Sequence, residues 1–211
     1  MNRRARTAQR TVGAWAFLGL WACALLPWYF PQDLSLLATL RGVFGGEATA
    51  SAVLQALQHG RPWLGAAVMA LAVSGAASLM LAGRAQGRLL VTASALGLLA
   101  VLGGGFAIGL RGWSFEVLSG WLGELPRGQI GLGLGAAVVL LSLLMLLGAG
   151  LARLGRFRGD VFVAGAVVLC SALLLLFVAL PVVRSLLGAF VDESGAWSAA
   201  AVVERLAHER V

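Results

Sequence analysis

An uncharged stretch from Val161 to Val183 constrains this chain most, because it contains almost nothing but Val, Leu, Ala and Phe. A helix needs about 20 apolar residues to cross a hydrocarbon layer of about 30 Å, so this stretch is long enough to span a membrane. In lipid the backbone must satisfy its own hydrogen bonds, which favours a helix. Pro181 lacks a backbone donor near the far end, where we expect a kink that turns the chain into the tail. The stretch therefore predicts a membrane-spanning helix at 161–183.

The composition extends this interpretation to the whole chain of 211 residues. Hydrophobic residues make up 60% of the sequence and charged residues 12%, whereas soluble domains are about a quarter charged. We therefore predict an integral membrane protein with an all-α fold, a polytopic transmembrane helical bundle of five spans. The expected spans are 12–29, 63–83, 89–110, 130–152 and 161–183. The polar-leaning segments 31–62 and 111–129 are expected to form short helices at the membrane surface.

The basic residues predict the orientation of these spans. All sixteen are arginines, and one group occupies the leader and two tight turns with Asp160 as its only acidic neighbour. Cytoplasmic loops are enriched in basic residues, so these segments and the N-terminus are predicted to be cytoplasmic. Trp28 and Tyr29 would then form an aromatic belt at the far interface. The topology arginines are Arg3, Arg4, Arg6, Arg10, Arg84, Arg88, Arg153, Arg156 and Arg158.

Small residues at helical spacing predict where the spans pack together. Helices in lipid associate through close van der Waals contact, which small side chains permit. A glycine-rich phosphate loop at 131–135 is disfavoured, because such a loop follows a strand and opens to water. The residues predicted to lie at helix contacts are the G-x-x-x-G pairs Gly105 with Gly109 and Gly131 with Gly135, and the pair Ser74 with Ser78.

The side chains that could carry chemistry are isolated from one another. They are Glu116, Glu124, His59, His208, Cys23 and Cys170. The two glutamates fit a solvated face, the histidines have no second ligand at metal spacing, and the cysteines lie in apolar runs. No Asp, Glu, Arg or His falls inside a predicted span, which disfavours an ion-coupled carrier or an intramembrane hydrolase. We predict no enzyme activity, no catalytic residue, no metal, no cofactor and no nucleic-acid partner.

The residues around and after the last span form a pattern that points to a family. They are Pro181, Phe190, Asp192, Glu193, Gly195, Trp197 and Ser198. This order resembles the start of the permease unit in binding-protein-dependent ABC transporters. Residues 112–141 together with 158–163 resemble the extra N-terminal helices of the long fused permeases of the ferric-iron type. The resemblance covers about half of the chain.

The resemblance implies a multi-pass permease component in the bacterial cell inner membrane. Residues 1–160 would be an N-terminal accessory bundle of four spans, and 161–211 the first span of the permease core with a periplasmic tail. The implied partners are the lipid bilayer, the remainder of the permease beyond Val211, a cytoplasmic ATPase subunit and a periplasmic binding protein. The implied substrate is iron(III) or another small solute, with thiamine and polyamines as close alternatives.

One departure from the family keeps a second class of function open. The cytoplasmic E-A-A…G loop that docks the ATPase in that family does not occur in this sequence. The alternative is a non-transporting membrane scaffold or assembly subunit, packed through glycine-rich helices.

Overall fold

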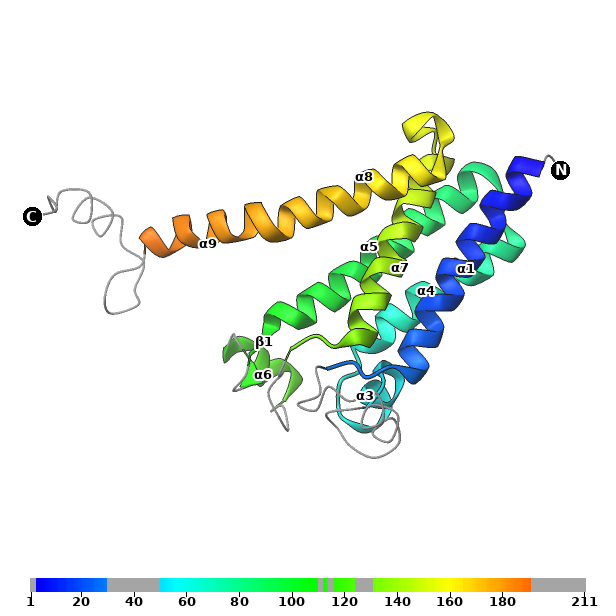
Figure 1. The fold of residues 1–211 in the computed structure, drawn as a ribbon. Helices are drawn as coiled ribbons and strands as arrows, with labels where there is room; N and C mark the ends of the chain where they lie inside the picture. The colour runs from blue at the N-terminus through cyan, green and yellow to red at the C-terminus, as the bar shows by residue number, and fades with distance from the viewer. Residues whose placement is uncertain (1–2, 30–49, 110–111, 114–115, 124–130, 191–211) are drawn as a thin grey trace, which may run out of the picture. The chain divides into compact units, whose positions relative to one another are not determined.

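The computed structural model describes residues 3–29, 50–109, 112–113, 116–123 and 131–190 (Figure 1). Most of these residues are helical, as the sequence predicts. The chain divides into two compact units, Met1–Val168 and Leu169–Val211. The division falls inside a helix, whereas the sequence pattern places a boundary at 160. Each unit is described separately.

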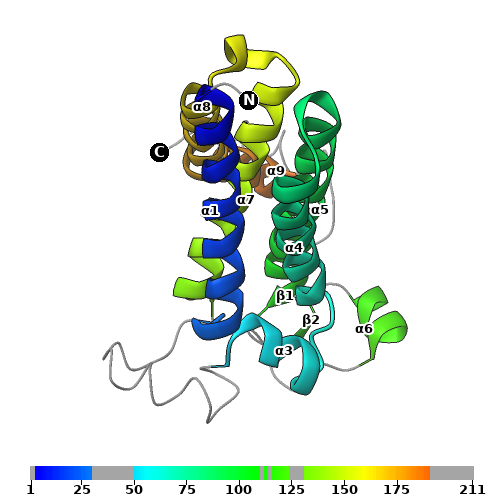
Figure 2. The ribbon, with the colours of Figure 1, turned by 90° about the vertical axis from the view of Figure 1, so that its right-hand side faces the viewer.

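Four helices form the body of the first unit. They are α1 (Arg3–Leu25), α4 (Leu64–Met80), α5 (Gly83–Ala107) and α7 (Leu134–Arg153). Helices α1 and α5 each pack against both α4 and α7, so the four surround a common core (Figure 2). Successive helices run in opposite directions. The start of α1, the α4–α5 turn and the end of α7 therefore lie at one end of the bundle, here called the arginine end (Figure 1).

Short elements cover the opposite end, here called the cap end. Helix α3 (Ala52–Gln58) packs on α4 and α1. Strands β1 (Ile108–Gly109) and β2 (Gly112–Trp113) form a small antiparallel hairpin, with Ile108 opposite Trp113, and α6 (Glu116–Leu122) follows. At the arginine end the turn η1 (Arg156–Gly159) leads from α7 into α8 (Val161–Leu174).

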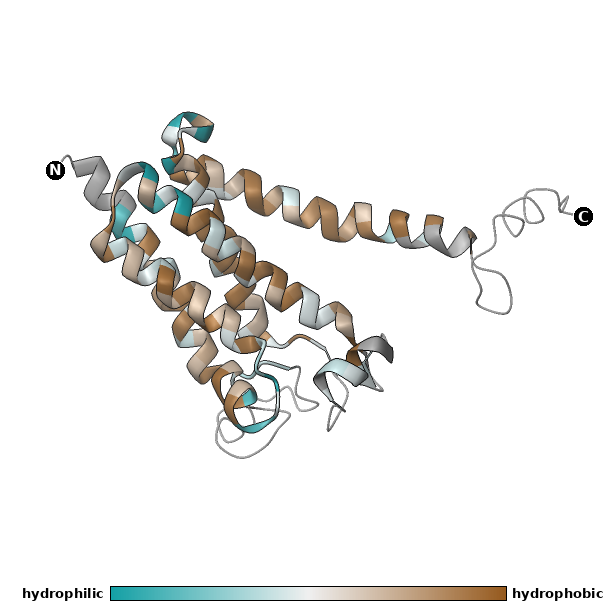
Figure 3. Ribbon diagram, turned by 180° about the vertical axis from the view of Figure 1, so that it is seen from behind, coloured by the Kyte–Doolittle hydropathy of each residue, from teal (hydrophilic) through white to brown (hydrophobic). Residues whose placement is uncertain are grey.

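Within the described residues, three helices are long and apolar enough to cross a membrane, namely α5, α7 and the helix over Val161–Val183. Helix α4 is apolar but shorter. Apolar residues predominate along these helices (Figure 3). At this level the prediction of a helical protein of membrane type is confirmed.

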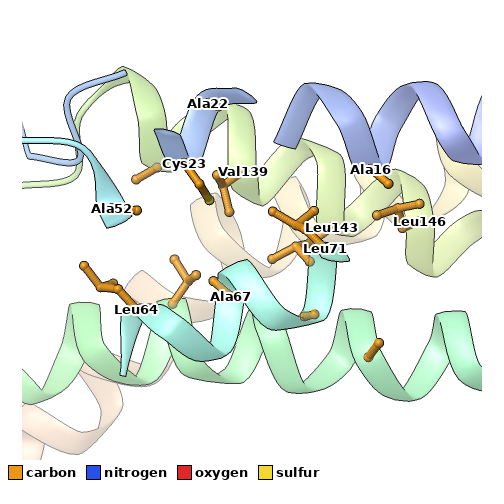
Figure 4. Packing of buried hydrophobic residues seen from close by; sticks show 14 of the residues in the cluster. Ala16, Ala22, Cys23, Ala52, Leu64, Ala67, Leu71, Val139, Leu143 and Leu146 are labelled. Atoms are coloured by element: carbon orange, nitrogen blue, oxygen red, sulfur yellow. The ribbon is translucent and has the colours of Figure 1, made fainter. Parts of the chain in front are cut away.

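The core of the bundle is built from leucines that face small residues. Leu71 of α4 and Leu143 of α7 are fully buried and meet between the helices, with Leu146 and Ala16 nearby (Figure 4). A Cβ added at Gly97 of α5 would lie 3.0 Å from a methyl carbon of Leu143. Placing large residues opposite small ones lets the helix backbones approach closely.

The helix that begins at Val161 continues beyond its expected end. Helix α8 runs into the π turn η2 (Leu175–Ala179) and then into α9 (Leu180–Ala189). Pro181 cannot donate to the carbonyl four residues earlier, and its ring would clash there. The wider π turn avoids this clash, and the Leu180 N–H donates to the Leu175 carbonyl. The apolar helix predicted at 161–183 is therefore found, and helical structure continues beyond it to Ala189.

Candidate functional site at the two ends of the bundle

At the cap end, the extended segment 27–29 after α1 lies between two other backbone segments and is called the strap. The Trp28 N–H donates to the Ala50 carbonyl at 3.1 Å. On the other side, the Gly133 N–H donates to the Trp28 carbonyl at 2.7 Å, and the Gly135 N–H donates to the Pro27 carbonyl at 2.9 Å. The strap therefore joins the end of α1 to the segments that lead into α3 and α7.

Gly135 permits this close approach of the strap. A Cβ added there would lie 2.8 Å from the Pro27 carbonyl oxygen and 2.9 Å from the Leu26 carbonyl oxygen. Gly131 lies before α7 and has a φ of 139°, so it is not helical. The prediction that Gly131 and Gly135 share one face of a spanning helix is corrected, because α7 begins only at Leu134.

The aromatic residues of the strap are buried and do not form an exposed belt. Trp28 is 1% exposed and Tyr29 4%. The guanidinium carbon of Arg61 lies 4.3 Å from the centroid of the Tyr29 ring, and Arg61 is itself only 2% exposed. A desolvated cation–π contact contributes about 2 kcal/mol. Sequence reasoning missed Arg61, whose only local signal is its place in a short polar segment just before Pro62 and Trp63.

Two further tryptophans attach the β hairpin to the bundle. The ring centroids of Trp63 and Trp113 lie 5.5 Å apart with the planes tilted by 56°. The Trp113 indole N–H donates to the Gly123 carbonyl at 2.8 Å. A Cβ added at Gly104 would lie 3.0 Å from the Trp63 indole nitrogen. Tilted aromatic pairs at this distance are stabilising, so the cap end is held by aromatic contacts.

At the arginine end, amide side chains connect all four helices. Gln9 Nε2 of α1 donates to the Ser78 carbonyl of α4. Gln86 Nε2 of α5 donates to the neighbouring Ala77 carbonyl at 3.0 Å. Arg153 Nη2 of α7 donates to Gln9 Oε1 at 3.3 Å. The Ser78 carbonyl, in the last turn of α4, thus receives a donor from α1, which satisfies a group that a helix end leaves free. The Ala77 carbonyl accepts both the Gln86 side chain and the Leu81 N–H.

The predicted serine pair is buried on α4. Ser74 Oγ donates to the Ala70 carbonyl and Ser78 Oγ to the Gly75 carbonyl, each at 2.7 Å. Both hydroxyls are therefore satisfied within their own helix. A Cβ added at Gly13 of α1 would lie 3.4 Å from Ser78 Oγ, so Ser78 faces α1.

The closest backbone approaches between helices occur at glycines that the sequence did not single out. A Cβ added at Gly150 of α7 would lie 3.0 Å from the Gly87 carbonyl oxygen of α5, and the reverse distance is also 3.0 Å. A Cβ added at Gly148 would lie 2.8 Å from the Gly165 Cα of α8. The available signal was the G-A-G sequence at 148–150 inside a run of large apolar residues.

The other predicted glycine pair lies elsewhere. A Cβ added at Gly105 would have its nearest neighbour, a methyl carbon of Leu132, 4.0 Å away. Gly109 belongs to β1, because α5 ends at Ala107. The prediction of one helical G-x-x-x-G face at these positions is therefore corrected.

The remaining predicted residues divide between the arginine end and the tail. Arg3, Arg4, Arg6 and Arg10 belong to α1, Arg84 and Arg88 to α5, Arg153 to α7, and Arg156 and Arg158 to η1. Phe190 is the last described residue. Asp192, Glu193, Gly195, Trp197 and Ser198 lie outside the described residues. Across the described ranges, no three His, Cys, Asp or Glu side chains gather as a possible metal site.

No protein-family model matches the chain, and neither a curated protein nor a solved structure matches it. The part of the chain that the structure describes is a helical protein with three helices able to cross a membrane, in which a four-helix unit is fastened at both ends. The case for a particular function comes from this geometry and from the sequence pattern.

Proposed function

We propose that the chain is the N-terminal part of a permease of a binding-protein-dependent ABC importer in a bacterial inner membrane. The observation that carries the proposal is the helix from Val161 through the π turn to Ala189. It ends directly before Phe190, where the permease-like order of residues continues. Residues 1–160 would be the accessory bundle, and the helix from Val161 the first helix of the transport core.

The packing of the bundle supports a bracing role. Its helices meet at Gly87 with Gly150 and at Gly148 with Gly165, where no room remains for side chains. The buried Ser74 hydroxyl donates its hydrogen bond to a carbonyl of α4, the helix to which Ser74 belongs. We propose that the remainder of the permease supplies the path for iron(III) or another small solute. A periplasmic binding protein would deliver the solute, and a cytoplasmic ATPase would supply the energy.

The proposed orientation has five spans and a cytoplasmic N-terminus. It is supported by the common location of the start of α1, the α4–α5 turn and η1 at the arginine end, since basic segments are retained in the cytoplasm. A reporter fused after Gln86 should be cytoplasmic and one fused after Ser119 periplasmic. The same side for both fusions would contradict this orientation.

The test of transport is solute uptake by the native bacterium after deletion of the gene. Uptake of labelled iron(III), thiamine and polyamine should be measured side by side. In the deletion strain the uptake of one of these solutes should fall, and the wild-type gene should restore it. Phe177→Glu places a charge inside the apolar helix and should fail to restore uptake, whereas Phe177→Leu should restore it. The amount of each variant in the membrane is measured by immunoblot.

Unchanged uptake of every tested solute after deletion would contradict the importer proposal. A specific feature would then favour the scaffold alternative, namely the fastening of the four helices at both ends, which suits a protein that holds others in place.

A further inference from the structure

The arginine end presents a positive surface formed by two neighbouring turns. Arg84 and Arg88 are exposed at the start of α5, one helical turn apart and thus on the same side of the helix. Arg156 and Arg158 are exposed in η1. Asp160 is the only carboxylate in these turns.

The carboxylate of Asp160 already has a structural role. Its Oδ1 accepts hydrogen bonds from the Phe162 N–H at 2.9 Å and the Val163 N–H at 3.1 Å. Asp160 therefore caps the start of α8, where the helix dipole also favours a negative charge. The surrounding arginines leave this end strongly positive.

Arg153 lies at the C-terminal end of α7, close to the start of α5. A Cβ added at Gly87 would lie 3.0 Å from Arg153 Cβ, so the stem of Arg153 packs on α5 at Gly87. Arg153 Nη2 donates to the neutral side chain of Gln9, while Arg153 Nε is buried and makes no hydrogen bond to the described part of the chain. Within the described part of the chain, the Arg153 guanidinium is thus hydrogen-bonded to a neutral side chain and not to a carboxylate.

The turn η1 adds an aromatic residue to this surface. Phe157 and Arg158 have φ values of 53° and 55°, a left-handed conformation that residues other than glycine seldom adopt. The turn presents Phe157, which is 37% exposed, between two exposed arginines. Aromatic rings favour the level of lipid headgroups, and guanidinium groups bind phosphate through paired hydrogen bonds.

We propose that the two turns bind the headgroup of an acidic phospholipid. Arg84 and Arg88 bind its phosphate, and Phe157 enters the boundary between headgroups and acyl chains. This inference depends on the proposed membrane orientation of the bundle. A lipid fits better than an acidic protein segment, because the arginine end would lie at the depth of the lipid phosphates and acidic lipids attract basic residues there.

The experiment is a native mass-spectrometry titration of the purified full-length chain in non-ionic detergent. Phosphatidylglycerol and phosphatidylcholine with identical acyl chains are compared, and the wild type should prefer phosphatidylglycerol. The double variant Arg84→Gln with Arg88→Gln should bind phosphatidylglycerol about 25-fold more weakly, because each arginine near the surface contributes about fivefold. Its binding of phosphatidylcholine should not change.

The matched control is Arg41→Gln with Arg127→Gln, two arginines of the segments 31–62 and 111–129 that belong to neither turn. This variant loses the same charge and should keep the preference. Arg84→Lys with Arg88→Lys keeps the charge and should bind with intermediate affinity, because ammonium cannot form the paired hydrogen bonds. An equal loss in the control, no preference in the wild type, or displacement of the lipid by excess inorganic phosphate would overturn the lipid site. The uptake assay on the wild type measures transport and does not depend on the lipid titration. Failure of the lipid site is therefore distinguishable from failure of the importer proposal.

Discussion

Substitution of Gly148 by alanine should destabilise the bundle, because the three atoms nearest to the new Cβ belong to the backbone of α8. The new Cβ would lie 2.8 Å from both the Cα and the N of Gly165 and 3.0 Å from the carbonyl carbon of Ala164. Carbon atoms pack best at about 3.5–4.0 Å, so α7 and α8 would have to separate by about 0.5–1 Å. A backbone cannot rotate away as a side chain can. Overpacking of this kind costs about 1–3 kcal/mol.

The matched control is Gly103→Ala in α5, where no atom lies within 4 Å of the new Cβ. Alanine stabilises a helix interior by about 0.5–1 kcal/mol relative to glycine, and this gain applies to both variants. The difference between the two variants therefore isolates the steric term, at about 1–3 kcal/mol. The free energy of unfolding is measured in mixed micelles with increasing SDS. A Gly148→Ala variant as stable as Gly103→Ala would refute the close contact of α7 with α8.

Three further predictions concern the cap end and the topology. Gly135→Ala should lower the free energy of unfolding by about 1–3 kcal/mol, because its Cβ would meet backbone carbonyls of the strap. Gly105→Ala should change this free energy little. Equal unfolding free energies of the two variants in the same micelle assay would contradict this prediction. Tyr29→Leu should lower the free energy of unfolding by about 2 kcal/mol through loss of the contact with Arg61. An unchanged midpoint of SDS unfolding would show that this contact contributes nothing to stability. A reporter fused after Phe157 should be cytoplasmic, and periplasmic activity would disprove the proposed topology.

The helices of the bundle could be predicted from the sequence because membrane thickness fixes a minimum length for an apolar run. Their ends were predicted less well. Residues 131–133 read as part of a span, but they lie before α7 and beside the strap. That pairing joins segments about a hundred residues apart, and no local pattern in the sequence encodes it.

The contacts made by individual glycines could not be predicted for a related reason. A G-x-x-x-G spacing shows that two glycines share a helix face, but the rotation of the helix decides what that face meets. Gly105 has little around it, while Gly148 and Gly150 contact two different helices. The rotation is set by all the contacts of the bundle together.

The burial of Arg61 was missed because an arginine in a polar-leaning segment is normally solvated. Here the strap places the Tyr29 ring beside the guanidinium and removes both from water. The polarity of the segment was evident in the sequence, but its position beneath the strap was not.

The central claim is that this chain works as part of an ATP-driven importer, and isolation of the chain from the native membrane tests it most directly. The tagged protein is purified from the native bacterium in mild detergent, and its partners and ATP hydrolysis are measured. We predict that an ATPase subunit remains bound and that its hydrolysis rises when the solute-loaded binding protein is added. A chain that reaches the membrane but purifies with no ATPase subunit and no ATP hydrolysis would contradict the claim.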